Sequence, residues 1–306
     1  MKYWLTTALL LVIVPGTEAH ERPRDRNGDP LADTTAHCAR ERELKILTWN
    51  IYMLPGIVPM KGQVDRARAI ADTLDRSDCD IIVFEEAFHH GAVRTLRERL
   101  RSAYPNMYGP FNRGGSPMRF SSGVWVVSRL PLRLLGTIEF QEAKSFDRAA
   151  RKGAALLEGE FNGRRFQILG THVQADDFPT VRALQLKEIY TGLLAKFRCD
   201  GVPQIICGDM NTENIRVAEY DAMLFSLDAQ DGASDGAQQT SYDAQTNRLA
   251  DKVWKNTRST VDYILLRLNG AVISSVKRSM SVIRAPWRKR HVDLSDHYGV
   301  LCELVF

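Results

Sequence analysis

One short stretch, Gly208-Asp209-Met210-Asn211, constrains the fold of this 306-residue chain more than any other. It follows the largely apolar run 203–207, whose length and composition predict a buried strand. Residues two apart in an extended backbone point to the same side, so Asp209 and Asn211 are expected to face one spot. Open sheets place their binding sites at the carboxyl ends of strands. The stretch therefore predicts a polar site at one edge of a sheet.

Polar side chains lie at the ends of other predicted strands in the same way. These strands are predicted over residues 44–49, 80–84, 165–170, 260–266 and 299–306. We expect their polar ends to meet at one edge, which gives a candidate site of Asn50, Glu86, His172, Asp209, Asn211, Asp262, Asp296 and His297.

Apolar residues recur at helical spacing between these strands. This spacing predicts helices over 63–76, 92–103, 180–197 and 216–225, and short strands are predicted over 123–128, 132–137 and 154–161. Asn162-Gly163 joins the last of these strands to 165–170 and is a strong hairpin signal. Residues 228–256 are polar and have no regular pattern. Irregular segments of this length are uncommon in compact domains and usually have a function. Strands and helices alternate without strict order, which predicts an α+β fold with two sheets packed together and helices outside.

The N-terminus predicts export. Residues 1–19 combine Lys2, an apolar run over 8–14 and a Pro15-Gly16 break, as a cleaved secretory signal does. A membrane anchor is the alternative, but the apolar run is short for a bilayer. Residues 20–42 are charged and poor in large apolar side chains, which predicts a flexible leader, and 43–306 is expected to form one domain. The mature protein is expected to be secreted or periplasmic.

Charge and cysteine content exclude some classes of protein. The net charge of +4 is too modest for a dedicated nucleic-acid binder, and it would suit weak attraction to anionic surfaces or phosphate substrates. The five cysteines are an odd number without a CxxC spacing, so one disulfide is conceivable but a disulfide scaffold is not. No cysteine lies where a nucleophile is needed.

The candidate residues have the chemistry of metal-assisted hydrolysis. They offer oxygen and imidazole groups without thiolates, and hard ligands such as Glu86 and Asp296 suit Mg²⁺, Mn²⁺ or Ca²⁺. One histidine could act as a general base on water while the other stabilises charge on phosphoryl oxygens. Asp262 has the right residue type to orient the base. No serine or cysteine elbow is evident, which favours direct attack by water.

Each candidate also has a structural alternative. Asp296 could cap a turn, His297 could be a surface histidine, Asn50 could form a turn, and His172 could bond locally. Glu85 competes with Glu86 and is expected to face the other way. His89 and His90 are adjacent and should point apart, which disfavours a shared metal.

Several motifs together resemble the endonuclease/exonuclease/phosphatase superfamily, and within it the secreted bacterial sphingomyelinases C. The resemblance covers residues 43–306, in the family's order. The superfamily shares Gly208-Asp209-Met210-Asn211 and Ser295-Asp296-His297. Two further stretches, 50–54 (Asn-Ile-Tyr-Met-Leu) and 171–175 (Thr-His-Val-Gln-Ala), are more specific to the sphingomyelinase branch, and Gly62-Gln63 with Arg66-Ala67 is part of the same resemblance.

The resemblance implies a deoxyribonuclease-like, four-layered α/β/β/α sandwich and an enzyme that converts sphingomyelin to ceramide and phosphocholine. It implies that Glu86 is the principal Mg²⁺ ligand with Asn50 and Asp296 beside it, and that Mn²⁺ or Co²⁺ can substitute. Asp209 and Asn211 would orient the metal's water or the phosphate. His297 would be the general base paired with Asp262, and His172 would stabilise the phosphoryl oxygens.

One region departs from the family pattern. Secreted members carry a hairpin with exposed aromatic residues before Ser-Asp-His, whereas here the region 284–291 is short and basic around Trp287. Trp287 could still dock at a phospholipid membrane surface, or the region could be a solvated turn. Two rival functions remain open. One is a secreted nuclease or phosphatase that acts on another phosphoester, and nucleic acid is a partner only under this alternative. The other is a lipid-binding protein without activity.

Overall fold

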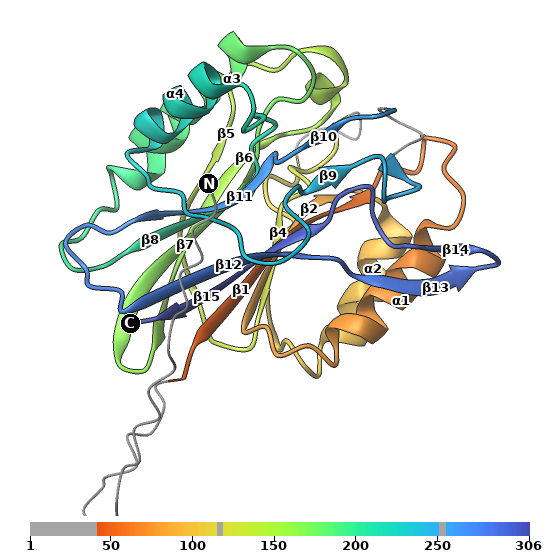
Figure 1. Cartoon of the computed structure of the whole chain (residues 1–306), viewed down its shortest axis with the longest axis horizontal. Helices are drawn as coiled ribbons and strands as arrows, with labels where there is room; N and C mark the ends of the chain where they lie inside the picture. Colours follow the sequence, from red (N-terminus) through yellow and green to blue (C-terminus); the bar gives the residue numbers. More distant parts are fainter. Residues whose placement is uncertain (1–41, 115–118, 251–254) are drawn as a thin grey trace, which may run out of the picture. The chain divides into compact units, whose positions relative to one another are not determined.

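Two β-sheets packed face to face form the centre of the segment 42–306 (Figure 1). The computed structural model describes residues 42–114, 119–250 and 255–306. The predicted signal peptide 1–19 and the leader up to residue 41 lie outside these residues. Arg42, which the sequence placed in the leader, donates a hydrogen bond to Asp80 over 2.5 Å. The division at residue 43 otherwise stays a prediction.

The first sheet has six strands and is mixed. Its central strand β1 pairs in parallel with β2 and antiparallel with β15. In spatial order the strands are β12 (Ser275–Ser281), β15 (Gly299–Val305), β1 (Leu44–Met53), β2 (Ile81–Ala87), β4 (Trp125–Ser128) and β3 (Asn106–Tyr108). Asn50 and Glu86 therefore lie on neighbouring strands near the same end of this sheet.

The second sheet has five strands and aligns three candidate residues in one row. In spatial order the strands are β11 (Asp262–Arg267), β8 (Gln204–Asp209), β7 (Arg164–His172), β6 (Gly153–Phe161) and β5 (Arg133–Glu139). The parallel pair β7–β8 places His172 opposite Asp209, and the antiparallel pair β8–β11 places Asp262 opposite Asp209. Asp262 begins its strand, but the antiparallel direction brings it to the same edge.

Helices cover the outer faces of both sheets. Helices α1 (Gln63–Leu74) and α2 (His90–Leu100) pack on the first sheet, while α3 (Pro179–Ile189), which continues as a π-helical turn over Tyr190–Leu194, and α4 (Val217–Leu227) pack on the second (Figure 1). Separate buried clusters fill the space between the sheets and each helix–sheet interface. These three apolar interfaces confirm the predicted four-layered α/β/β/α sandwich.

The sequence missed the short and polar elements. These are β3, β12, the 3₁₀ turn Ser145–Ala149, the hairpin β13 (Arg284–Arg288)–β14 (His291–Asp293), and the pair β9 (Tyr242–Asp243)–β10 (Arg258–Ser259). The predicted Asn162-Gly163 hairpin is confirmed, because Phe161 pairs with Arg164. The predicted strands around Pro131 are present but belong to different sheets, so the chain crosses between the layers there.

The described cysteines, Cys79, Cys199, Cys207 and Cys302, are free thiols. Within the described residues, none of the helices has the length and apolar character needed to cross a bilayer.

Candidate active site

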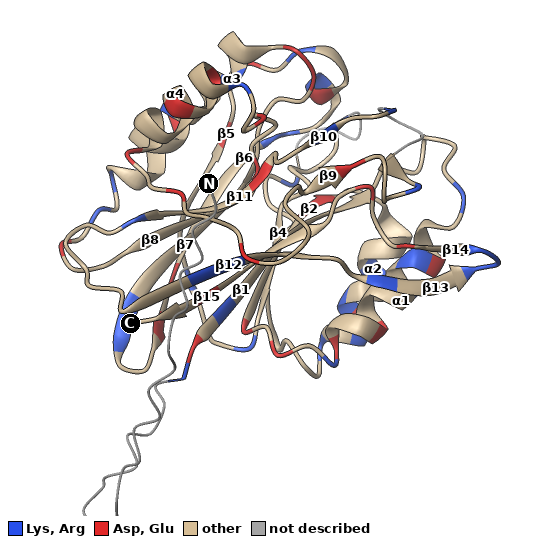
Figure 2. Cartoon of the chain, in the orientation of Figure 1, with Lys and Arg blue, Asp and Glu red and all other residues tan. Residues whose placement is uncertain are grey.

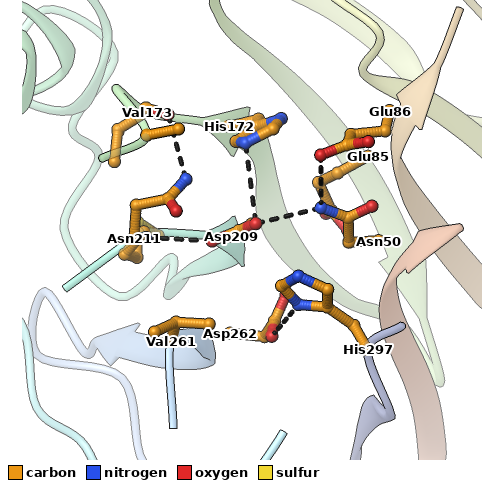
Figure 3. A network of polar contacts seen from close by, with 12 residues as sticks. Asn50, Glu85, Glu86, His172, Val173, Asp209, Asn211, Val261, Asp262 and His297 are labelled. Carbon is orange, nitrogen blue, oxygen red and sulfur yellow. Dashed lines mark hydrogen bonds and ion pairs between the residues drawn. The ribbon is translucent and has the colours of Figure 1, made fainter. Parts of the chain in front are cut away.

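Asp209 lies at the centre of the candidate site and is held by amide groups on both carboxylate oxygens. Its Oδ1 accepts a hydrogen bond from the backbone N–H of Asn211 over 2.9 Å, and its Oδ2 accepts one from Nδ2 of Asn50 over 3.0 Å. The backbone of Asn211 is left-handed, with φ 47°, so the strand turns there instead of remaining extended. Its side chain still lies beside Asp209 and donates to the carbonyl of Val173 (Figure 3).

Glycine is required before Asp209 because β7 approaches closely. A Cβ on Gly208 would lie 2.0 Å from the carbonyl oxygen of Thr171, and its φ of 152° is one that side chains rarely adopt. The Gly-Asp pair thus lets β7 and β8 converge at the row of His172 and Asp209.

Asn50 connects the two sheets. Its Nδ2 donates to Oε1 of Glu86 over 3.1 Å as well as to Asp209, while its Oδ1 accepts the backbone N–H of Tyr52 over 3.0 Å. The amide nitrogen therefore faces both acids (Figure 3). Its oxygen, which the resemblance makes a metal ligand, is already an acceptor from Tyr52 and retains a second lone pair.

The surroundings of Glu86 are those of a carboxylate that could bind a cation. Its Oε2 is buried without a hydrogen-bond partner among the described residues. Burial, together with the negative charge of Asp296, raises the pKa of Glu86 to about 7. Asp296 is only 5% exposed, and burial raises its pKa as well. A divalent cation between two such carboxylates would remove the cost of their ionisation, so the residues fit Mg²⁺.

Ligand atoms also gather nearer to the histidine. One ligand atom each of Asp209, Asp262 and His297 lies within 4.8 Å of the others. Asp262 bonds to His297 through its Oδ2, and its Oδ1, like Oε2 of Glu86, is buried without a hydrogen-bond partner among the described residues. The described residues therefore offer two positions for a hard cation, one at Glu86 and Asp296 and one at Asp209, Asp262 and His297.

His297 and Asp262 form a buried histidine–carboxylate pair from the two sheets. Nδ1 of His297 lies 2.8 Å from Oδ2 of Asp262, and the other ring nitrogen faces the side of Asp209 and Asn50 (Figure 3). Burial alone would lower the pKa of His297, but the charge and hydrogen bond of Asp262, with the charge of Asp296, raise it well above its usual value. The pair has the arrangement of a general base and its orienting acid.

The long segment 228–256 contacts this pair. A role at the site agrees with the expectation that an irregular segment of this length has a function. Ser241 accepts the backbone N–H groups of Val261 and Asp262 on its Oγ, each over 3.1 Å. The ring of Tyr242 stands edge-on to that of His297, with the ring centres 5.1 Å apart. Neither residue was identified from the sequence, because an irregular segment has no periodicity that shows where it returns to the sheet.

His172 contacts a buried lysine. Nζ of Lys152 lies 3.0 Å from Nε2 of His172, closer than Oδ2 of Asp209 at 3.5 Å. An ammonium group can only donate, so Nε2 accepts and the neutral ring carries its proton on Nδ1, which has no partner among the described residues. Burial, with the charge of Lys152, lowers the pKa of His172 to about 3, so the ring is neutral at physiological pH.

Lys152 was missed, although the sequence contains a signal for it. Asp147 accepts its ammonium over 2.8 Å and the carbonyl of Val173 accepts it over 3.0 Å. The Asn162-Gly163 turn fixes the hairpin register, and counting back along both strands places Lys152 opposite Val173, beside His172.

Arg66 on α1 holds the end of β1 against the segment before β15. Its side chain is fully buried and donates to the carbonyls of Ile51 over 3.1 Å, Leu294 over 2.6 Å, and Tyr52. Asn50 and Asp296 lie next to these anchored segments, so Arg66 keeps their separation fixed.

Three other expectations have clear outcomes. Glu85 accepts the hydroxyl of Thr48 over 2.7 Å, and burial, with the charges of Asp262 and Asp209, raises its pKa well above the usual range, so it lies beside the site and does not face away from it as expected. His89 caps α2 by accepting the N–H of Ala92, so it is not one of a metal pair with His90. Asn50 and His297 lie in the site and not in turns at the surface.

The expectation that Trp287 docks at an interface is not supported. The region 284–291 folds as hairpin β13–β14 beside α1, with basic residues at its tip (Figure 2). The Trp287 ring packs against Gly62, donates to the carbonyl of Asp293 over 2.9 Å and contacts the ring of His291. The ring is therefore half-buried against the protein.

A cleft of about 340 Å³ opens beside His297 and Asn211. Asp177 and Arg216, which pair over 2.9 Å, lie on its rim, and Tyr242 forms part of its wall. Of the sequence-predicted residues, Asn211 and His297 line this cleft.

The match to known proteins agrees with this geometry. Residues 47–297 match the Endonuclease/Exonuclease/phosphatase family, and the chain belongs to this family. A phospholipase C of Staphylococcus aureus is 27% identical, with 88% of this chain and 91% of that protein covered. A sphingomyelinase C of Listeria ivanovii is 29% identical, with 84% and 85% covered.

Solved structures show the same similarity. The crystal structure of beta toxin from Staphylococcus aureus matches with a TM-score of 0.77 at 26% identity, covering 85% of this chain and 99% of that one. The resemblance to sphingomyelinases C that the sequence motifs predicted is confirmed.

Proposed function

We propose that this chain is a Mg²⁺-dependent phosphodiesterase that hydrolyses sphingomyelin to ceramide and phosphocholine. The observation that carries the proposal is that the His297–Asp262 pair and the partnerless carboxylate oxygen of Glu86 both lie in the polar network around Asp209, beside a cleft that His297 lines. The similarity to proteins named sphingomyelinase C, over most of both chains, supports the substrate.

Glu86 and Asp296 would hold the cation, with Asn50 positioning Glu86 through its amide nitrogen. When bound, Mg²⁺ supplies neutralisation of phosphoryl charge and makes water more acidic. A beta toxin variant crystallised with bound magnesium ions supports the choice of metal. Mn²⁺ and Co²⁺ are expected to substitute, because the donor set is made of carboxylate and amide oxygens.

His297 takes the proton of the attacking water. Its Nδ1–H donates to Asp262, which fixes the ring so that Nε2 faces the reacting water. The water oxygen attacks phosphorus, the bond from phosphorus to the ceramide oxygen breaks, and that oxygen takes up one proton, which balances the proton that His297 accepted. Since a base must be unprotonated, a cation that offsets the charge of Asp296 would also favour the active form of His297.

His172, Asp209 and Asn211 act on the phosphate and the water. His172 is neutral and carries a proton on Nδ1, which suits it to stabilise a phosphoryl oxygen by hydrogen bonding. Asp209 is held by Asn50 and Asn211, so its carboxylate has a fixed direction for orienting the water. Lys152 keeps His172 in this protonation state.

The physiological partner is a phospholipid membrane surface that contains sphingomyelin, and we expect the mature protein to be secreted or periplasmic. The predicted signal peptide is the basis for export. The relatives' names support the membrane substrate and say nothing further of this chain.

The test is a parallel assay of the mature protein on sphingomyelin vesicles, phosphatidylcholine vesicles and plasmid DNA, each with Mg²⁺ and with chelator. Release of phosphocholine from sphingomyelin only in the presence of metal is the expected result. Cleavage of DNA with both lipids untouched would contradict the lipid substrate and leave a nuclease. No turnover of any substrate would favour an inactive lipid-binding protein.

A further inference from the structure

Three strongly exposed apolar side chains lie on loops at the edge of the sheets where the active site opens. Ile57 is 80% exposed, Phe146 is 92% exposed and Ile215 is 66% exposed. Ile57 follows the end of β1, Phe146 lies in the 3₁₀ turn Ser145–Ala149 between β5 and β6, and Ile215 follows Asn211. We call these three residues the apolar rim.

Phe146 is fixed next to the active site by its neighbour in the chain. Asp147 pairs with Nζ of Lys152 over 2.8 Å and accepts the backbone N–H of Ala175 over 2.7 Å. Lys152 contacts His172, and Ala175 lines the cleft. The exposed ring is therefore one residue away from a side chain that is anchored in the site.

Ile215 lies between two residues that are fixed beside the cleft. Asn214 exchanges two hydrogen bonds with Thr260, which is close in the chain to Asp262. Arg216 lines the cleft and pairs with Asp177. Ile57 lies in a loop on the other sheet, where the backbone N–H of His89 bonds to Met53 at the end of β1.

The charge around Phe146 fits a lipid interface. Lys144 and Arg148 flank it in the chain, and both are exposed. An aromatic ring favours the headgroup level of a bilayer, and cations beside it can approach lipid phosphates. An exposed aromatic ring with cations on both sides in the chain is therefore the composition expected of a contact with a phospholipid surface.

We propose that the apolar rim, with Phe146 as its main anchor, contacts the surface of a phospholipid bilayer and holds the cleft against it. The proposal rests on the proposed function, because a membrane-embedded substrate requires the cleft to face the lipid. It assigns the contact to the loop between β5 and β6 of the second sheet. Hairpin β13–β14, whose only tryptophan is turned toward α1, is not the anchor.

Phe225 provides a matched control. It is 88% exposed, but it lies near the end of α4, whose cap residue Asp228 pairs with Arg267 over 2.8 Å. Arg267 is the last residue of β11, and Asp262 at the other end of that strand is in the active site. Phe225 thus has the same chemistry at the opposite edge of the sheet.

The first measurement is fluorescence quenching of Phe146→Trp and Phe225→Trp by brominated phosphatidylcholine vesicles in the presence of chelator. These conditions exclude turnover. We expect additional quenching, relative to the parent protein, for Phe146→Trp and none for Phe225→Trp. Equal quenching of the two variants, or none in either, would overturn the proposal.

The second measurement separates docking from catalysis. Phe146→Ala should weaken vesicle binding about tenfold. The substitution removes an aromatic ring whose transfer from water into the bilayer favours binding. Its vesicle hydrolysis should fall in parallel, while hydrolysis of a water-soluble phosphocholine ester and the melting temperature stay unchanged. Phe225→Ala should change none of these quantities.

The outcomes distinguish this proposal from the proposed function. If the parent protein hydrolyses no phosphocholine ester but Phe146→Trp is quenched, docking stands and the sphingomyelinase assignment fails. If the parent protein hydrolyses sphingomyelin vesicles and Phe146→Ala does so equally well, the docking surface is wrong. A loss confined to Lys289→Gln with Arg290→Gln would place the contact on the hairpin and also overturn it.

Discussion

The site contains two histidines, and their neighbours shift the pKa values of the two side chains in opposite directions. Asp262 and Asp296 raise the pKa of His297 despite its burial, whereas burial and Lys152 lower that of His172 to about 3. Pairs of groups whose environments separate their pKa values commonly divide the roles of proton acceptor and neutral donor. We therefore expect His297 to accept a proton during the reaction and His172 to remain neutral.

Replacement of His297 by alanine tests the first half of this account. His297→Ala should lower kcat by about 10²- to 10⁴-fold, the usual contribution of a general base. The melting temperature should remain close to that of the parent, since the ring makes one side-chain hydrogen bond. His90→Ala is the control, because His90 is exposed at the start of α2 and should retain full activity. A near-parental rate for His297→Ala would reject its role as base.

The adjacent glutamates offer a matched test of the metal site. Glu86→Gln keeps the shape and an acceptor for Asn50 but removes the charge, so the Mg²⁺ concentration for half-maximal activity should rise about 10- to 100-fold. Glu85→Gln is the control, because the carboxyl of Glu85 accepts the hydroxyl of Thr48 and burial raises its pKa well above the usual value. Metal titration of activity measures both. An unchanged titration for Glu86→Gln would mean that another carboxylate binds the metal.

At this scale the sequence predicted which residues meet but not how they bond. Asp209, Asp262 and His172 were found because strand ends align at a sheet edge. The direction of the Asn50 amide could not be read from the sequence, because it depends on acids from two different sheets. The role of Ser241 depends on a long irregular segment whose path has no sequence periodicity.

At the scale of elements, the site depends on one buried side chain of α1. Arg66 joins the ends of β1 and the segment before β15 through three backbone carbonyls. Burial lowers the pKa of Arg66 to about 10, which still leaves it charged at neutral pH. Helix α1 thus positions the catalytic edge as well as covering the sheet.

Arg66→Met should cost about 3 kcal/mol of unfolding free energy, because buried carbonyls lose their donor. The measurement is chemical denaturation. Arg68→Met is the control on the same helix, where Arg68 is exposed and pairs with Asp65. Its loss should cost less than about 1 kcal/mol. Equal destabilisation by both changes would show that Arg66 acts only as part of the helix and not as a link between strands.

Element prediction succeeded where the pattern was periodic. Helix α1 and hairpin β6–β7 have regular apolar spacing or a two-residue turn that fixes the register. The edge strand β12 and hairpin β13–β14 have mostly polar, half-exposed residues, so their strand character comes from pairing with neighbours distant in the sequence. Trp287 illustrates the consequence, because its inward orientation depends on Gly62 of another element.

At the scale of the molecule, the sandwich brings carboxylates close together, where their negative charges repel each other. A bound metal ion would offset the free-energy cost of this repulsion. Burial and Asp296 raise the pKa of Glu86 to about 7, above its usual value of 4.5. The folded state without metal therefore binds a proton that the unfolded chain releases. Its stability should fall as pH rises from about 4.5 through about 7.

Thermal unfolding with Mg²⁺ and with chelator tests this linkage. Mg²⁺ at about 100 times its dissociation constant should stabilise the fold by about 2.7 kcal/mol. The increase in melting temperature should be larger at about pH 8 than at about pH 6, where the proton competes for Glu86. The difference should disappear in Glu86→Gln. A metal-induced increase that is the same at both pH values in the parent would contradict the assignment.

The central claim is that water, activated by His297, attacks phosphorus. The most direct test is hydrolysis of sphingomyelin vesicles in oxygen-18 water with Mg²⁺, followed by phosphorus NMR and mass spectrometry of the products. We expect phosphocholine that carries one oxygen-18 atom and ceramide that carries none. Oxygen-18 in the ceramide hydroxyl, or release of choline with ceramide phosphate, would show that a different bond is broken and would contradict it.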